Sequence, residues 1–141
     1  MTRGEIEAFI ARRQEAWKRR DAGELAADHS DDCVLESPVG GTVRGRDAIL
    51  SIYAGWISAF PDVEFRQERL VIDRDQAVQF TKMSGTHAGE FCGLPASGKH
   101  FEVRCVFLFV FAGGKIVREV RVYDFAGLLL QLGVLKAKPS L

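Results

Sequence analysis

The stretch "FEVRCVFLFVFAGGKIVREVRVYD", residues 101–124, decides the fold of this 141-residue chain. Two runs rich in β-branched and aromatic residues flank Gly113-Gly114, a strong signal for a two-residue β-hairpin turn. The register then follows by counting outward from the turn. It predicts one almost wholly apolar face built from the pairs Phe111 with Ile116, Phe109 with Arg118, Phe107 with Val120, Cys105 with Val122, and Val103 with Asp124.

This register places Asp124 at the rim of an apolar surface. Burial there would raise the pKa of the carboxyl group, which suits a general acid or base working near neutral pH. Asp124 also precedes "FAGLLLQLG", residues 125–133, which has the pattern of a short helix, and Asp is among the best N-cap residues. Capping and catalysis both remain open, and a single β-bulge would turn the predicted face over.

The rest of the chain alternates between helical and extended patterns. A capping-box spacing at Thr2 and Glu5 begins an N-terminal helix, and Pro61 ends a helix that begins near Asp47. Helices set apart from strands predict an α+β domain, with a curved antiparallel sheet wrapped around helices to form a cone-shaped pocket. The other expected elements are a short helix at 22–28, a strand at 33–38, a Gly-rich loop at 39–47 and a hairpin of strands at 63–72 and 77–87.

Composition narrows the class of protein. An apolar fraction of 47% with ten Phe fits one packed domain, and 19 basic residues balance 19 acidic ones. Without a net field, neither nucleic acid nor a membrane is an expected partner. Cys33, Cys92 and Cys105 are widely spaced, so we expect reduced thiols in a cytoplasmic protein and no metal site.

Several motifs resemble one family. The run "GTHAGEFCGLPASGKH" at 85–100 and the ending "DFAGLLLQLG" at 124–133 are similar to SnoaL-like proteins of the nuclear transport factor 2-like (ketosteroid isomerase-like) superfamily. "SPVGGTVRGRDAI" and "FPDVEF" also fit the family pattern, so the resemblance covers nearly the whole chain. It implies a single SnoaL-like domain over residues 1–141, with an apolar pocket and usually a homodimer.

The resemblance also implies a chemistry. Characterised SnoaL-type members are polyketide cyclases that close a ring by an intramolecular aldol reaction with no cofactor and no metal. Asp124 matches the acid/base aspartate of the motif, and His87 lies in its G-T-H segment, where it could stabilise an oxyanion. Glu119 and Val120 stand where many members carry His-Trp.

We therefore expect a small apolar ligand, polyketide-like or carbonyl-containing, and a cofactor-independent proton transfer such as aldol cyclisation or isomerisation. Tyr53 and Trp56 lie on the apolar face of the third helix, where they could be core, pocket or both. Two alternatives remain: a non-catalytic small-molecule-binding dimer module, or a limonene epoxide hydrolase-like hydrolase that would use Arg104. The expected substrate contacts are Tyr53, Trp56, Val103, Cys105, Phe107, Val120 and Val122.

Overall fold

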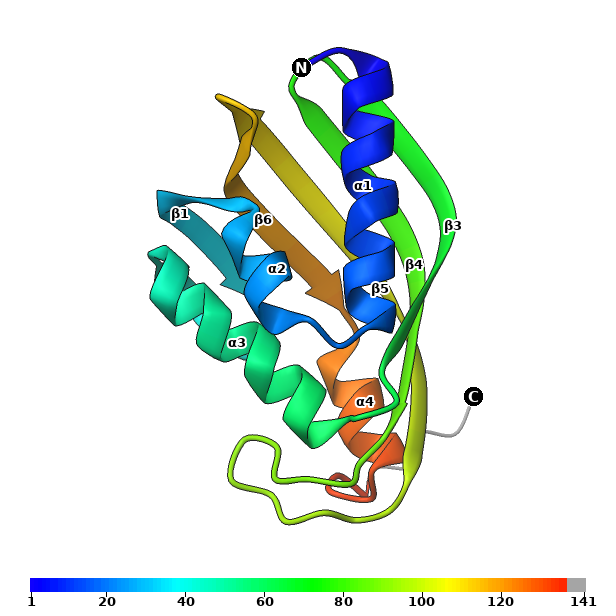
Figure 1. Cartoon of the computed structure of the whole chain (residues 1–141). Coiled ribbons are helices and arrows are strands. Elements are labelled where there is room, and N and C mark those ends of the chain that lie inside the picture. The colour runs from blue at the N-terminus through cyan, green and yellow to red at the C-terminus, as the bar shows by residue number, and fades with distance from the viewer. Residues whose placement is uncertain (137–141) are drawn as a thin grey trace.

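A curved six-stranded sheet and four helices make up residues 1–136, the part of the chain that this computed structural model describes (Figure 1). The helices are α1 (Arg3–Lys18), α2 (Ala22–Ala27), α3 (Arg46–Ala59) and α4 (Phe125–Gln131). The strands are β1 (His29–Ser37), β2 (Gly41–Arg44), β3 (Glu64–Asp73), β4 (Gln76–Thr86), β5 (His100–Ala112) and β6 (Lys115–Tyr123). They lie in the order β2-β1-β6-β5-β4-β3.

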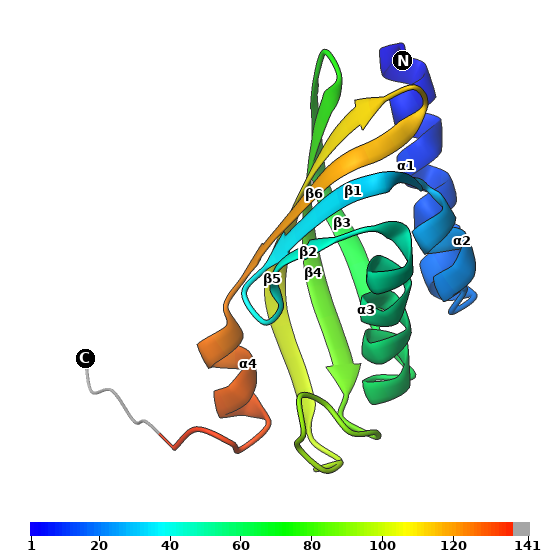
Figure 2. The ribbon, with the colours of Figure 1, turned by 90° about the vertical axis from the view of Figure 1, so that its left-hand side faces the viewer.

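The helices divide between the two sides of the sheet. Figure 2 shows α1, α2 and α3 on one face, whereas α4 lies at the far end of β6 on the other side. The core fills the space between the sheet and the first three helices, with Tyr53 of α3 and Phe109 of β5 among its largest buried side chains. The predicted α+β class with a curved sheet around helices is confirmed, and the sheet stays open at both edges.

The structure confirms the strongest local signals in the sequence. Thr2 caps α1 in a capping box with Glu5, and α3 ends at Ala59, two residues before Pro61. Gly113 and Gly114 have φ values of 57° and 76°, the left-handed conformation that a tight hairpin turn requires at both positions. The hairpin of β5 and β6 is therefore confirmed at its turn.

Two details of the sheet differ from expectation. The Gly-rich segment expected as loop contains β2, which pairs with β1 as a short antiparallel hairpin. Strand β1 begins at His29 rather than Cys33 and runs parallel to β6. The sheet is therefore mixed, because a long connection through α3, β3, β4 and β5 separates these two neighbours and imposes no antiparallel order.

A β-bulge corrects the predicted register of the last hairpin. Phe111 pairs with Ile116 as predicted, but Val110 then pairs with Arg118, which leaves Val117 as the extra residue. Every residue of β6 beyond the bulge is shifted by one position, and a one-residue shift exchanges the two faces of a strand. Val103, Cys105 and Phe107 stay on the buried face as predicted, whereas Val120 and Val122 lie on the outer face.

The same shift brings three polar side chains of β6 inside. Glu119, Arg121 and Tyr123 alternate with the outer valines and are 0%, 4% and 8% exposed. A strand that was predicted to contribute valines to the interior therefore contributes a carboxylate, a guanidinium and a phenol. These three groups position the candidate site.

Candidate functional site

A buried ion network crosses the inside of the fold. Glu119 of β6 lies at its centre: Oε1 accepts a hydrogen bond from the Tyr53 hydroxyl (2.5 Å), and Oε2 accepts one from Arg121 Nε (2.5 Å). Arg13 of α1 donates to the same Tyr53 oxygen (2.6 Å) and to Asp28 Oδ2 (2.8 Å). The network consists of Arg13, Asp28, His29, Tyr53, Glu119 and Arg121. These residues come from α1, the end of α2, β1, α3 and β6.

His29 lies beside the central carboxylate of this network. Its Nδ1 lies 3.1 Å from the carbonyl oxygen of Leu25 and 3.2 Å from that of Ala26, and its Nε2 lies 3.0 Å from Glu119 Oε1. Both ring nitrogens therefore face oxygen atoms, and the ring joins the end of α2 to Glu119.

The network keeps its groups in their charged or hydrogen-bonded forms. Burial alone would raise the pKa of Glu119, but Arg121, His29 and Arg13 outweigh it and hold the pKa well below its ordinary value. Burial raises the pKa of Tyr53, so this phenol keeps its proton and donates it to Glu119. Burial also raises the pKa of the Cys105 thiol to about 12, and this thiol stays protonated.

Three other buried polar atoms have no hydrogen-bond partner within residues 1–136. They are Nη2 of Arg121, the hydroxyl of Tyr123 and Nε2 of His87, and we call them the open donors. Burial raises the pKa of Tyr123, although Arg121 opposes this shift, so the phenol keeps its proton and is a donor. The backbone N–H of Val39 approaches the phenol oxygen without forming a hydrogen bond. Buried polar groups without a partner are rare in proteins and call for a reason.

The hydrogen bonds at Nδ1 of His87 show why its other ring nitrogen, Nε2, is the third open donor. The backbone N–H of Ser97 donates to its Nδ1 (3.2 Å), and the Ser97 hydroxyl lies 2.9 Å from the same nitrogen. The proton of the neutral ring therefore sits on Nε2, which makes this buried atom a donor. The ring packs against Phe60 and Phe91, with centroids 5.6 and 6.4 Å away.

A mostly apolar pocket of about 190 Å³ lies at this end of the fold. Trp56 forms part of its wall and contacts Tyr123 edge-on, with ring centroids 5.8 Å apart, and Phe91 at 5.0 Å. We call it the mouth pocket. It lies between the β1–β2 turn, α3 and the loop after β4, and is lined by Ser37, Val39, Gly40, Ser51, Ile52, Gly55, Trp56, Glu90, Phe91 and Cys92.

The loop that closes the mouth pocket is held against the end of α3. The backbone N–H groups of Ala88 and Gly89 both donate to the carbonyl oxygen of Ala59, at 3.0 and 3.1 Å. A Cβ at position 89 would lie 2.4 Å from the carbonyl oxygen of Ser58, so only glycine permits this approach. The contact places Glu90, Phe91 and Cys92 over the pocket.

Asp124 lies outside this interior. It is the N-cap of α4, where Oδ1 accepts a hydrogen bond from the backbone N–H of Gly127 (2.9 Å), and its side chain is exposed. The expected position at the rim of the apolar face is wrong, because the bulge at Val117 displaces it and β6 ends at Tyr123. Of the two roles left open, the geometry supports the cap.

The remaining expectations divide between the two faces. Trp56 lines the mouth pocket and Tyr53 lies in the ion network, while Cys105 and Phe107 pack beside Arg121. Val103 is buried on the same face. Arg104 is exposed on the outer face and pairs with Glu68 (3.2 Å), so it takes no part in the interior.

Sequence reasoning missed Glu119, Arg121, Tyr123 and the partners His29 and Asp28. One signal pointed to them: Arg13 interrupts the apolar face of α1, and a buried arginine requires a buried carboxylate partner. The pattern along α1 could not say which carboxylate this would be. Glu119 lies 106 residues further along the chain, and only the sheet brings the two together.

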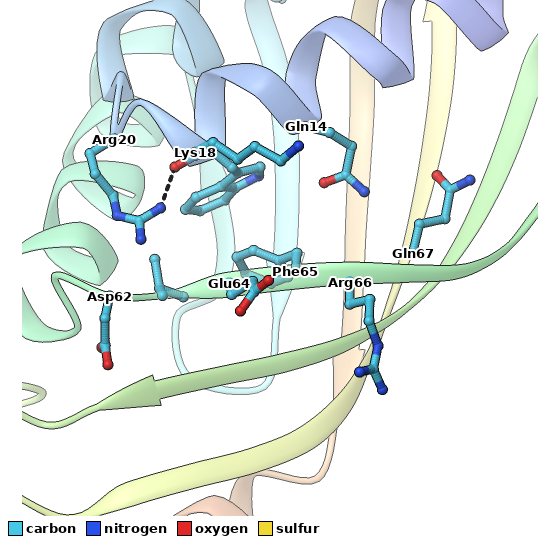
Figure 3. A pocket seen from close by; sticks show the side chains of 10 residues that line it. Gln14, Lys18, Arg20, Asp62, Glu64, Phe65, Arg66 and Gln67 are labelled. Carbon is cyan, nitrogen blue, oxygen red and sulfur yellow. Dashed lines mark hydrogen bonds between the residues drawn. The ribbon is translucent and has the colours of Figure 1, made fainter.

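A larger groove, about 540 Å³, runs between α1 and the edge strand β3 (Figure 3). Trp17 and Phe65 contact each other there at 4.5 Å between ring centroids, and charged side chains such as Lys18 and Arg66 line the groove. The open donors are absent from the residues that line either the groove or the mouth pocket, but the rings of Tyr123 and His87 contact Trp56 and Phe91 in the wall of the mouth pocket. Size alone favours the groove, whereas these contacts favour the mouth pocket.

Two further observations concern other kinds of site. Residues 1–136 hold no group of three His, Cys, Asp or Glu side chains arranged to bind a metal ion. Within the same residues, every helix is too short or too polar to cross a membrane.

Residues 8–132 match the SnoaL-like polyketide cyclase family, so the chain belongs to that family. No curated protein matches the chain.

Solved structures show the same fold. AclR from Streptomyces galilaeus, a candidate hydroxylase, is 26% identical with a TM-score of 0.84, over 98% of this chain and 91% of its own. IdmH from Streptomyces antibioticus, a candidate polyketide cyclase, is 28% identical with a TM-score of 0.75, over 91% and 98%. A protein of ketosteroid isomerase-like fold from Catenulispora acidiphila has 18% identity and a TM-score of 0.76, over 96% of each chain.

Proposed function

We propose that this protein binds a small, largely apolar carbonyl compound through the mouth pocket and catalyses a cofactor-independent proton transfer on it, in an aldol cyclisation or an isomerisation. The observation that carries the proposal is the set of three buried open donors, because the rings of two of them, Tyr123 and His87, contact Trp56 and Phe91 in the wall of an apolar pocket. Family membership supports it, and so does the likeness to IdmH.

The open donors suit the oxygen of an enolate. Removing a proton from the carbon next to a carbonyl places negative charge on the carbonyl oxygen, and donors buried from water stabilise that charge best. Tyr123 and Arg121 would bind this oxygen, and the Nε2–H of His87 would donate to it or protonate the product. In a cyclisation the enolate carbon then attacks a second carbonyl of the same molecule, and the alkoxide formed takes up a proton.

The base in this scheme is a carboxylate, and there are two candidates for it. Glu90 is the carboxylate among the residues that line the mouth pocket. Asp124 follows Tyr123 directly and matches the family motif, although its side chain caps α4. Glu90 needs no change of structure to reach a ligand, whereas Asp124 would have to release the Gly127 N–H.

Hydrogen–deuterium exchange tests the proton transfer without knowledge of the natural substrate. 2-Tetralone, an apolar bicyclic ketone, is incubated with the protein in D₂O, and proton NMR follows the loss of its signals next to the carbonyl. We expect exchange above the buffer rate and a decrease of about 100-fold in Tyr123→Phe or His87→Gln, the usual effect of removing one oxyanion donor. Comparison of Glu90→Gln with Asp124→Asn identifies the base, and exchange that matches buffer alone contradicts catalysis.

A non-catalytic binding module is the second candidate, and one observation favours it. All three open groups are donors, and the interior offers no unpaired carboxylate within residues 1–136. This alternative predicts that 2-tetralone raises the melting temperature of the protein while its protons exchange at the buffer rate. Trp56→Ala should then abolish the thermal shift.

We also propose that the protein forms a homodimer through the outer face of the sheet. The pairings between strands place apolar side chains of β4, β5 and β6 side by side there, and Val122 is 61% exposed. Figure 2 shows no helix over this part of the sheet. Exposed apolar patches of this kind mark interaction surfaces. The patch consists of Val78, Phe80, Val106, Leu108, Val120 and Val122.

Light scattering coupled to size-exclusion chromatography tests the dimer. Val122→Lys places a charge within the patch and should yield a monomer of half the mass. Leu50→Lys is the matched control, because Leu50 is exposed to 39% on α3, away from the sheet face. A wild-type monomer, or a dimer that persists in Val122→Lys, would contradict this surface.

A further inference from the structure

One buried cation of the interior keeps an unpaired donor. Arg13 and Arg121 are buried guanidinium groups, and each is at most 4% exposed. The buried carboxylates that face them are those of Asp28 and Glu119. Arg13 donates to both Asp28 and Tyr53, whereas Arg121 leaves one of its nitrogens without a partner.

The unpaired donor of this cation has a definite location. Asp28 accepts from Arg13, while Glu119 accepts from Arg121, His29 and Tyr53. Arg121 uses its Nε for Glu119, and its Nη2 makes no hydrogen bond. Its guanidinium lies over the rings of Tyr53 and Phe107, at 4.7 and 5.5 Å from their centroids. Aromatic faces attract a cation but give Nη2 no oxygen acceptor.

A second unpartnered donor lies next to Arg121. Tyr123 is two residues further along β6 and therefore on the same face, about 7 Å away by strand geometry. Its ring is in contact with Trp56, which lines the mouth pocket. Tyr123 therefore lies directly behind the wall of the mouth pocket, and Arg121 lies next to it on the same face of β6.

We propose that this pair is an anion site and that the natural ligand of the mouth pocket is an apolar molecule bearing a carboxylate. This inference rests on the proposed function, because it names the chemical class of the molecule that the mouth pocket takes. An ionised oxygen would supply the missing acceptor to both donors and would form a charge-assisted hydrogen bond with the Arg121 guanidinium, which is about twice as strong as a neutral one. A neutral ketone would satisfy the donors without this gain.

Matched probes separate charge from shape. 2-Naphthoate and 2-naphthamide have nearly the same size and differ by the charge of the carboxylate, and their binding to the full chain is measured by titration calorimetry at pH 7. We expect the naphthoate to bind about tenfold more tightly or better, the usual gain from a hydrogen bond to a charged group. Tyr123→Phe should reduce this ratio by several-fold, because it removes one of the two donors.

Removing Arg121 needs a compensated variant, because Arg121→Met alone leaves Glu119 with one cation fewer. The double variant Glu119→Gln/Arg121→Met removes one positive and one negative charge together. We expect it to bind the amide as wild type does and to lose the preference for the carboxylate. Circular dichroism confirms that each variant is folded, and Tyr123→Phe tests the site independently if the double variant does not fold.

The outcomes distinguish this inference from the proposed function. Equal binding of naphthoate and naphthamide to wild type overturns the anion site and leaves the apolar pocket standing. A preference for naphthoate that survives both Tyr123→Phe and the double variant also overturns it. Binding of neither probe overturns both the anion site and the proposed pocket.

Discussion

The two ends of the interior contain similar polar side chains but satisfy them differently. Near α1 and α2, Arg13, Asp28 and Glu119 are all hydrogen-bonded to one another or to shared partners. Near the mouth pocket, Tyr123 and His87 each have a buried donor that lacks an acceptor within residues 1–136. Arg121 belongs to both ends, with Nε bonded and Nη2 free.

This contrast separates structural from functional chemistry. A satisfied buried network costs little once formed and makes the surrounding packing specific, but removal of one member leaves a charge uncompensated. An unsatisfied donor lowers stability in the free protein and gains a partner only when a ligand arrives. Mutations at the two ends should therefore have opposite effects on stability and on binding.

The largest expected effect is the loss of the central carboxylate of the network. Glu119→Ala leaves the buried guanidinium of Arg121 without its anion, and removal of one partner from a buried pair costs about 3–5 kcal/mol. Urea unfolding followed by circular dichroism measures the change. Glu102→Ala on the exposed face of β5 is the control, expected within about 0.5 kcal/mol of wild type; equal effects would mean that the network adds no stability.

Low pH should lower the stability of the protein by protonating Glu119. The pKa of Glu119 lies below its unfolded value of about 4.3, so its stabilisation is fully present above that pH and is lost as pH falls through the folded-state pKa. The free energy of unfolding of wild type should therefore decrease between pH 5 and pH 3 more steeply than that of Glu119→Gln. Parallel pH profiles for the two proteins would show that Glu119 is not held ionised by its partners.

Two tyrosine substitutions compare the ends directly. Tyr53→Phe removes a hydroxyl that donates to Glu119 and accepts from Arg13, which should cost about 1–3 kcal/mol. Tyr123→Phe removes a buried hydroxyl that makes no hydrogen bond, so stability should stay unchanged or increase slightly. Thermal unfolding of both variants gives the comparison, and a destabilised Tyr123→Phe would mean that its hydroxyl already has a partner.

The smallest effect belongs to Asp124. Asp124→Ala removes the side-chain acceptor of the Gly127 N–H and should cost about 1 kcal/mol, while Asp124→Asn keeps an N-cap side chain and should change stability little. Thermal unfolding distinguishes the two variants. A cap predicts that only Asp124→Ala is destabilised, whereas an interior carboxylate would make both variants behave alike.

Much of the fold could be predicted from the sequence because the signals are local. Thr2 with Glu5, the residue before Pro61 and the Gly113-Gly114 turn each act on neighbouring residues, and each holds in the structure. The capping role of Asp124 is local in the same way, since the Gly127 N–H is three residues away.

The candidate site could not be predicted from local signals, because the bulge at Val117 reverses which face of β6 points inward. Val117 is an ordinary β-strand residue, and nothing in its neighbours requires it to bulge. The partner strands show the reason: Val110 and Phe111 of β5 skip Val117, and on the other side the pairing of β1 with β6 shifts between His29 and Val34. The pairing of β6 is therefore irregular near Val117 on both of its sides, with β5 and with β1.

The sequence alone therefore determined most of the elements, their caps and turns, and the family to which they point, because each depends on residues close together in the chain or on a recognisable motif. The tertiary structure decided which face of β6 looks inward. That choice brings Glu119 to His29, 90 residues away, and leaves Arg121 and Tyr123 in the interior with a donor each that has no partner. Sheet curvature and the pairing of distant charges made this decision, and neither is encoded in a short stretch of sequence.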